Sequence, residues 1–250
     1  MRKFLNPAKF GEYSGEEYTS LPEYYFTPFW NEINLGLSTD SYGSNDFHGR
    51  FHPSIVEVTL RRFTKPGEVV WDTFAGSGTT IDVSKAFGRR CIATDLHPTR
   101  SDIIQADSAT FDPGKVHCVI MHPPYMGIVN YNSPMSSTTS VDEFVALFGE
   151  VFDNVNRHLE GSRVVCVVIG EVYVNSEMVP LDCHIHQLIS KDYHYRMLGR
   201  VVKDYGRDTK GGAFTGKKFN NLWNYRILKY GIFRYGIDTV MWFQKPKEKL

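Results

Sequence analysis

From residue 51 onward, apolar runs of strand length alternate with segments of helical periodicity. This alternation is the strongest constraint on the fold, because it is typical of a doubly wound, mostly parallel sheet with helices on both faces. We therefore predict an α/β fold with a seven-stranded sheet that includes an antiparallel edge strand. The expected strands cover residues 68–76, 90–96, 102–107, 116–121, 163–170, 195–204 and 238–246, and the expected helices cover 54–63, 79–88, 141–159 and 180–192.

Residues 1–50 differ from the rest of the chain, because they are rich in Tyr, Phe, Pro, Ser and Asn and show little periodicity. We expect them to form an N-terminal arm packed on one domain that spans residues 51–250. A chain of 250 residues is long enough for one such domain with an appendage. The net charge is zero, which excludes a globally basic nucleic-acid-packing protein but not a local basic surface.

The sequence also indicates where the protein works. No apolar run approaches the 18 or so residues of a membrane helix, and the first residues lack the apolar segment of a secretory signal. The four cysteines form no CxxC pair, which favours free thiols in a reducing compartment. We therefore expect a cytoplasmic protein with no membrane partner.

A Gly-rich turn, DTFAGSGTT at residues 72–80, follows the first expected buried strand. Gly76 and Gly78 allow a sharp turn and a close approach of backbone to a ligand, and the helix beginning near Thr79 aims free N–H groups at the same place. The turn lacks the Lys of a P-loop, and Ile81 stands where the dinucleotide fingerprint has its third Gly. The turn therefore predicts a ligand site, but does not by itself identify the ligand.

Acidic residues stand at the ends of the next two expected strands. Asp95 comes about 20 residues after the turn, where a carboxylate can accept hydrogen bonds from a ribose diol; a helix N-cap is an equal alternative. Asp107 ends the third strand, where it could reach an adenine amine. An equally good interpretation is that Asp107 only forms a turn.

The segment MHPPY at residues 121–125 forms a second motif. Pro123 and Pro124 end the strand and fix the backbone, while Tyr125 offers a flat ring beside them. A histidine, an outward carbonyl and a ring together suit a planar heterocycle with an amino group, because the ring can stack on a base and the acceptors can take its N–H bonds. The alternative is a strand end with a packing tyrosine.

Together the two motifs resemble the exocyclic-amino DNA methyltransferases, in which a DxFxGxGTT turn, a strand-end acid and a (D/N/S)PP(Y/F/W) motif follow in this order. The resemblance covers roughly residues 47–245 and makes residues 51–250 a methyltransferase domain of Rossmann-like type. It implies methyl transfer from S-adenosylmethionine to adenine N6 or cytosine N4 of a DNA base flipped out of the duplex. It also raises the expectation of a specificity or nuclease partner of a restriction-modification system.

The resemblance assigns roles residue by residue. It implies that the cofactor-binding residues are His52, Pro53, Asp72, Phe74, Ala75, Gly76, Gly78, Thr79, Thr80, Asp95, Leu96, Asp107 and Ser108, and that the catalytic residues holding the base are His122, Pro123, Pro124 and Tyr125. No metal is implied, and the histidines of CHIH at residues 183–186 lack a matching ligand pair. Glu171, after the fifth expected strand, faces the same edge of the sheet but receives no role.

His122 departs from the family pattern, which has Asp, Asn or Ser at this position. The usual clue to the target base is therefore lost. A neutral imidazole still has one acceptor nitrogen, so we expect activity to fall as the pH drops through about 6.5, the unperturbed histidine value. The alternatives are a methyltransferase that acts on amino groups of RNA and a non-catalytic subunit that binds the cofactor or DNA.

A basic, aromatic stretch precedes the last expected strand. Residues 191–235 contain eleven Lys or Arg and three Asp, interleaved with aromatic residues. We expect an insertion at about 205–235 to contact nucleic acid, DNA rather than RNA, through phosphate contacts; a solvated basic face is the alternative. The loop at residues 126–140 either closes over the base or is a surface loop. The expected nucleic-acid contacts are Arg207, Lys210, Lys217, Lys218 and Arg226.

Overall fold

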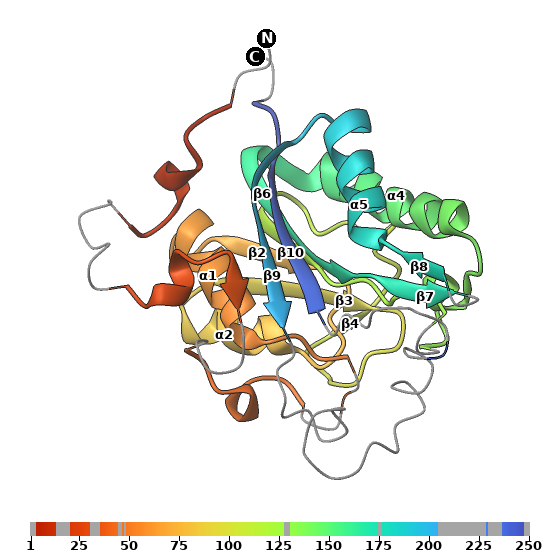
Figure 1. Cartoon of the computed structure of the whole chain (residues 1–250). Coiled ribbons are helices and arrows are strands. Elements are labelled where there is room, and N and C mark those ends of the chain that lie inside the picture. The colour runs from red at the N-terminus through yellow and green to blue at the C-terminus, as the bar shows by residue number, and fades with distance from the viewer. Residues whose placement is uncertain are drawn as a thin grey trace.

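The computed structural model describes residues 4–13, 21–30, 36–44, 47, 49–127, 131–174, 177–204, 229 and 237–247. Its centre is an eight-stranded sheet with the order β1-β9-β10-β6-β5-β2-β3-β4 (Figure 1). The strands of this sheet are β1 (Phe29–Trp30), β2 (Val69–Asp72), β3 (Arg90–Asp95), β4 (Ile104–Gln105), β5 (Val116–Met121), β6 (Leu159–Gly170), β9 (Arg196–Asp204) and β10 (Ile237–Gln244).

Five α-helices, a small second sheet and short 3-10 helices surround the main sheet in the described residues. The strands β7 (Val172–Val174) and β8 (Glu177–Val179) pair with each other in antiparallel fashion directly after β6. The helices are α1 (Pro53–Phe63), α2 (Thr79–Ala86), α3 (Pro134–Ser137), α4 (Val141–His158) and α5 (Leu181–Gln187), and a π-helical segment, Leu188–Asp192, extends α5.

The predicted fold class is confirmed, with two corrections to the sheet. The sheet has eight strands, because the two-residue strand β1 adds to β9 in parallel fashion. The antiparallel strand β10 is not at the edge: it lies between β6 and β9 and pairs with both. A strand as short as β1 leaves no periodic pattern in the sequence, and the side on which β10 pairs is set by tertiary packing.

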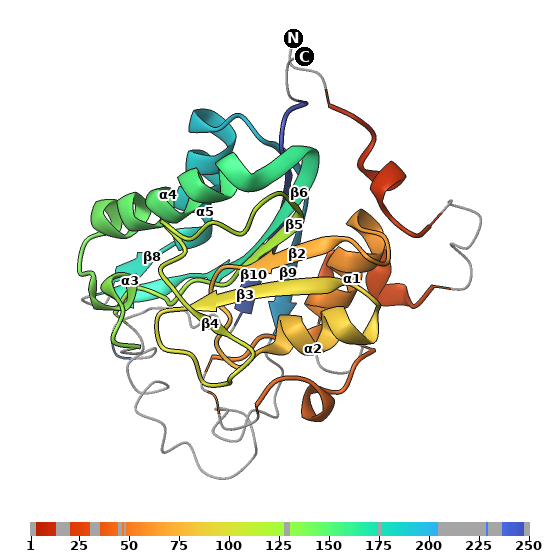
Figure 2. The ribbon, with the colours of Figure 1, turned by 180° about the vertical axis from the view of Figure 1, so that it is seen from behind.

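Helices cover both faces of the sheet, α1 and α2 on one and α4 and α5 on the other (Figures 1 and 2). The alternation of side chains along β6 explains how one strand serves two cores. Val165 and Val167 pack with α4 and α5, whereas Val164 and Cys166 pack with α1 and the N-terminal residues. Because β6 is buried on both faces, its sequence is a continuous apolar run rather than an alternating one.

The described residues of the N-terminal segment contact α1 through a buried carboxylate. The hydroxyl groups of Tyr24 and Tyr25 donate hydrogen bonds to Glu57 at 2.9 and 3.0 Å. Trp30 packs edge-on against Trp242 of β10, with 5.8 Å between the ring centroids. Tyr24, Tyr25 and Trp30 belong to the same buried cluster as the side chains of α1 and of this face of the sheet.

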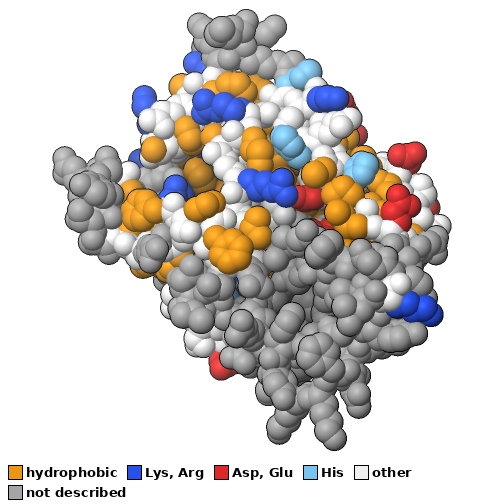
Figure 3. Space-filling view, in the orientation of Figure 1, with side chains coloured by type: hydrophobic (Ala, Val, Ile, Leu, Met, Phe, Trp, Pro, Cys, Tyr) orange, Lys and Arg blue, Asp and Glu red, His pale blue; other side chains and the backbone are white. Residues whose placement is uncertain are grey.

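The surface that the structure describes carries mixed charges. On the face in Figure 3, Lys and Arg side chains are interspersed with hydrophobic ones rather than gathered in one region. No described helix is long and apolar enough to cross a membrane. The five residues expected to contact nucleic acid, Arg207, Lys210, Lys217, Lys218 and Arg226, lie outside the described residues.

Candidate functional site

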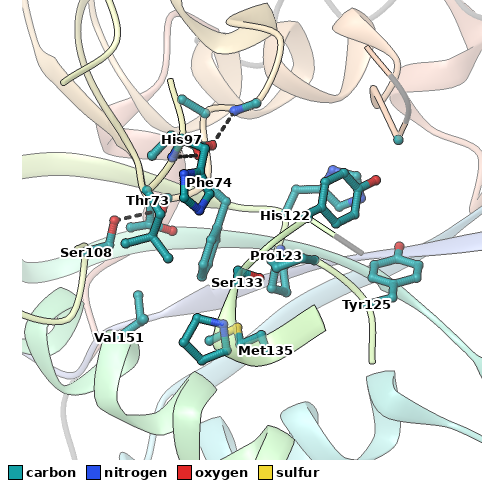
Figure 4. A pocket seen from close by; sticks show the side chains of 18 of the residues that line it. Thr73, Phe74, His97, Ser108, His122, Pro123, Tyr125, Ser133, Met135 and Val151 are labelled. Carbon is teal, nitrogen blue, oxygen red and sulfur yellow. Dashed lines mark hydrogen bonds between the residues drawn. The ribbon is translucent and has the colours of Figure 1, made fainter. Parts of the chain in front are cut away.

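A cavity of about 610 Å³ opens at the carboxyl ends of β2, β3, β5 and β6. This volume lies in the range of small-molecule sites, and the carboxyl edge of an open α/β sheet is where ligands bind. Figure 4 shows Phe74, Pro123 and Met135 near its centre, with His122 and Tyr125 to one side. The predicted site residues that line the cavity are Phe74, Ala75, Gly76, Asp95, Leu96, Asp107, Ser108, His122, Pro123, Pro124 and Tyr125.

The Gly-rich turn reaches the cavity through backbone that only glycine adopts readily. Gly76 has a φ of 48°, and a Cβ atom there would lie 2.9 Å from the ring of Phe47. The turn is fixed at its first half, because the N–H of Ala75 donates to the carbonyl of Thr94 in β3 at 3.0 Å. The two strands β2 and β3 therefore hold the turn against the cavity.

Asp95 ties this turn to the end of β3. Its Oδ2 atom accepts a hydrogen bond from the N–H of Gly76 at 2.9 Å, and its Oδ1 atom accepts one from the N–H of His97 at 2.9 Å. The side chain thus caps backbone N–H groups in two loops rather than the start of a helix. Asp95 also lines the cavity, and an ionised carboxylate can accept more hydrogen bonds than these two.

Ser108 and Asp107 follow β4 and have different environments. The hydroxyl of Ser108 is buried, donates to the carbonyl of Thr73 at 2.7 Å and lies 2.7 Å from the hydroxyl of Thr94 (Figure 4). Asp107 is exposed, and its carboxylate accepts a hydrogen bond from the N–H of Ala109 at 2.9 Å. Ser108 therefore supports the cavity wall, whereas Asp107 both forms a turn and lines the cavity.

Asp72 lies beneath the turn and does not line the cavity. Its side chain is fully buried, and its Oδ1 atom accepts a hydrogen bond from the N–H of Phe74 at 3.0 Å. The Oδ2 atom has no hydrogen-bond partner among the described residues. Burial raises the pKa of Asp72 to about 6. This carboxyl group holds the turn through its hydrogen bond to Phe74. Its burial lowers the stability of the fold when the group is ionised.

The other predicted cofactor residues support the site from outside the cavity lining. His52 caps α1, where its Nδ1 atom accepts a hydrogen bond from the N–H of Ser54 at 3.2 Å. Burial, with Lys203 and Arg50 nearby, lowers the pKa of His52 to about 3, so the ring is neutral. The residues of this group are His52, Pro53, Gly78, Thr79 and Thr80, all in or next to the first turns of α1 and α2.

The HPPY segment follows β5 directly, and its aromatic rings are held by their neighbours. The ring of His122 packs edge-on against Phe51 and Tyr125, with centroid distances of 5.2 and 5.7 Å. The hydroxyl of Tyr125 donates to Oδ1 of Asp238 at 2.6 Å. Burial lowers the pKa of His122, only partly opposed by Asp238. We therefore expect activity to be lost at a pH below 6.5, rather than at about 6.5 as for an unperturbed histidine.

Several lining residues were not predicted from the sequence. Phe47 stacks on Tyr131, with 6.1 Å between the ring centroids and 21° between the planes. These rings come from the N-terminal segment and from the loop after the HPPY motif, and both line the cavity. The loop at 126–140 is a candidate cover on sequence grounds, but no sequence pattern indicates Phe47, Phe51 or Asp238.

Basic residues on β9 are already engaged. Arg196 donates to Gln244 at 2.6 Å, and the guanidinium of Arg200 pairs with the buried Asp182. Lys203 is buried near His52 and His122. Among the described residues there is no group of three or more His, Cys, Asp or Glu that could hold a metal ion.

Comparisons with known proteins agree with the first motif. A family model described as DNA methylase, of the N6 and N4 type, matches residues 11–106. The resemblance predicted from the sequence is confirmed. The match includes the Gly-rich turn and Asp95 and ends before His122.

One curated protein and several solved structures are similar to the chain. The Type II methyltransferase M.MjaII of Methanocaldococcus jannaschii is 26% identical over 116 residues, which cover 46% of this chain and 21% of that protein. A precorrin-6y C5,15-methyltransferase of Geobacter metallireducens GS-15 has a TM-score of 0.48 at 15% identity, covering 84% of this chain and 97% of that one. TrmN of Thermus thermophilus has a TM-score of 0.49 at 16% identity, and the match covers 79% of this chain and 50% of TrmN.

The buried carboxyl group of Asp72 predicts a pH-dependent stability. Its pKa is about 6 in the folded protein, above the ordinary value of 3.8 for an aspartate. Folding therefore favours the protonated form, so this group's contribution is complete below about pH 4 and is lost as the pH rises through 6. Between pH 4 and 7 we expect ionisation of Asp72 to lower the free energy of unfolding of the wild type by about 2–3 kcal/mol, and Asp72→Asn to lack this decrease.

Urea unfolding of the ligand-free protein at a series of pH values measures the effect. The difference in the free energy of unfolding between Asp72→Asn and the wild type should grow in favour of the variant from pH 4 to 7. Asp107→Asn, at an exposed position, is the control and should run parallel to the wild type. Parallel curves for Asp72→Asn as well would contradict the account of this site.

Proposed function

We propose that the protein transfers a methyl group from S-adenosylmethionine to an exocyclic amino group, adenine N6 or cytosine N4, of a base in DNA. One observation carries the proposal: a single cavity is lined by the Gly-rich turn, by Asp95 and by the HPPY segment. A two-substrate transfer needs both ligands to meet in one space. The partial match to the DNA methylase family supports DNA as the substrate class.

The cofactor side of the cavity suits a nucleoside joined to an amino acid. Gly76 places backbone without a side chain at the cavity wall, next to the ring of Phe47, and Asp95 offers acceptor oxygens at the strand end. The hydroxyl of Thr73 is buried at the cavity with no hydrogen-bond partner among the described residues. S-adenosylmethionine supplies, when bound, a methyl group on a positively charged sulfur.

The base side is formed by the HPPY segment. Pro123, Pro124 and Tyr125 offer flat, apolar surfaces on which a base can stack. His122 is kept neutral by burial, so one ring nitrogen can accept a hydrogen bond from the amino group of the base. We propose that the base is flipped out of the duplex, because its amino group is otherwise paired and stacked inside the helix.

Further parts of this proposal concern the setting of the reaction. We propose a cytoplasmic location, which the four free cysteines support. We also propose that a specificity or nuclease partner accompanies the chain, as the resemblance to methyltransferases of restriction-modification systems implies. The basic residues at 205–235 are proposed to contact the phosphates of the DNA.

Methyl transfer can be tested with labelled S-adenosylmethionine, mixed-sequence DNA and total RNA, followed by mass spectrometry of the nucleosides. We expect N6-methyladenine or N4-methylcytosine in DNA, and the product also identifies the target base. Label found only in RNA would support the proposed methyl transfer but would show that the substrate is RNA rather than DNA. Cofactor binding without product on either nucleic acid would contradict the proposal and favour a non-catalytic subunit, in line with the histidine at position 122.

Substitution of His122 tests its role as a hydrogen-bond acceptor. We expect His122→Ala to lower kcat by about 100-fold or more, and His122→Asn to lower it much less, because the amide oxygen still accepts. Because neutral His122 is the active form and its pKa is lowered, the wild-type rate should stay constant from about pH 8 to about 6.5 and fall only below. Equal rates for the two variants would show that the ring is only structural.

A further inference from the structure

Two carboxylates from outside the HPPY motif enter the base side of the cavity. Glu171 follows β6 directly, and Asp238 is the second residue of β10. The strands bring them together, because Asp238 pairs with Gly170, the residue before Glu171. Both side chains line the cavity that also contains His122 and Tyr125.

The two acids differ in their hydrogen bonds. Asp238 is buried and accepts the hydroxyl of Tyr125 at 2.6 Å. In Glu171, by contrast, the Oε1 atom is buried and accepts no hydrogen bond from any described residue. A buried carboxylate oxygen without a donor is costly. The position therefore suits a ligand that brings an N–H or O–H donor into the cavity.

Nearby charges do not satisfy Glu171 either. Burial raises the pKa of Glu171, a hydrogen bond from its own backbone N–H partly opposes this, and Asp182 and Asp238 raise it further. Arg200 acts in the opposite direction, but its guanidinium pairs with Asp182. Glu171 is thus an acceptor in an acidic, partly dehydrated part of the cavity, where an incoming donor is bound more strongly than in water.

We propose that Glu171 accepts a hydrogen bond from the exocyclic amino group of the target base, and so supplies the carboxylate that His122 replaces in the motif. The inference rests on the proposed function. An exocyclic amine has two N–H bonds, and a neutral imidazole offers one acceptor nitrogen. His122 and Glu171 together provide an acceptor for each hydrogen.

The same contact accounts for the proton that the reaction releases. The amine nitrogen forms a bond to the methyl carbon, the carbon–sulfur bond breaks, and its electron pair remains on the sulfur. The methylated nitrogen then carries one proton too many. That proton passes to the carboxylate of Glu171 and from there to solvent. Glu171 is therefore assigned as a catalytic residue that touches the reacting amine.

Kinetics of Glu171→Ala and Glu171→Gln test the assignment. We expect Glu171→Ala to lower kcat for methyl transfer by about 100-fold while leaving the Kd for S-adenosylhomocysteine unchanged. Glu171→Gln should retain more activity than Glu171→Ala, because its amide oxygen still accepts a hydrogen bond. A thermal melt of each variant is the control that it is folded. Glu177→Ala, an exposed acid of the adjoining β8, should match the wild type. Wild-type kcat in both Glu171 variants would overturn the proposal.

A binding experiment decides the role of Glu171 even without catalysis. Protein saturated with S-adenosylhomocysteine is titrated, by saturation-transfer NMR, with deoxyadenosine and deoxycytidine and with analogues that lack the amino group. We expect the wild type to prefer one amino nucleoside over its analogue, and Glu171→Ala to show a clearly weaker preference, because His122 alone remains as an acceptor. An undiminished preference in Glu171→Ala, or no preference in the wild type, refutes the proposal. Failure of the wild type to methylate DNA would refute the proposed function alone.

Discussion

The site depends on the parallel pairing of β2 with β3 and with β5. Parallel neighbours end at the same edge of a sheet, so the residues that follow each strand must share one space. The Gly-rich turn after β2, Asp95 at the end of β3 and the HPPY segment after β5 therefore meet, although about 50 residues of sequence separate the first from the last. The helices on both faces hold this edge in place by burying the strands from either side.

Buried acidic groups are a common feature of this edge. Burial raises the pKa of Asp72 and of Glu171, and Asp238 is buried at the same edge of the sheet. Such groups lower stability unless a ligand or a hydrogen bond compensates them. Asp72 orients the turn and Asp238 holds Tyr125. Glu171 has a buried oxygen without a donor among the described residues, and a substrate N–H group can supply the missing hydrogen bond.

Much of the fold and part of the site were predictable because their signals are local. The apolar runs of β2, β5 and β6 and the glycines of the turn each lie within about ten residues of sequence. Phe51 and Asp238 were not predictable, because they reach His122 and Tyr125 only through tertiary packing. The internal position of β10 was missed for the same reason: a connection of 32 residues, 205–236, separates it from β9, and sequence does not say on which side a returning strand pairs.

The strand-end turn and Asp95 form the proposed site for S-adenosylmethionine, and calorimetric titration with S-adenosylhomocysteine tests this site most directly. The wild type and Asp102→Ala, a variant at a nearby exposed acid, should bind with similar Kd. Asp95→Ala should bind at least about tenfold more weakly, because both the ribose acceptor and the hydrogen bond to Gly76 are lost. Equal binding by Asp95→Ala and the wild type, or no binding by the wild type, would contradict the account.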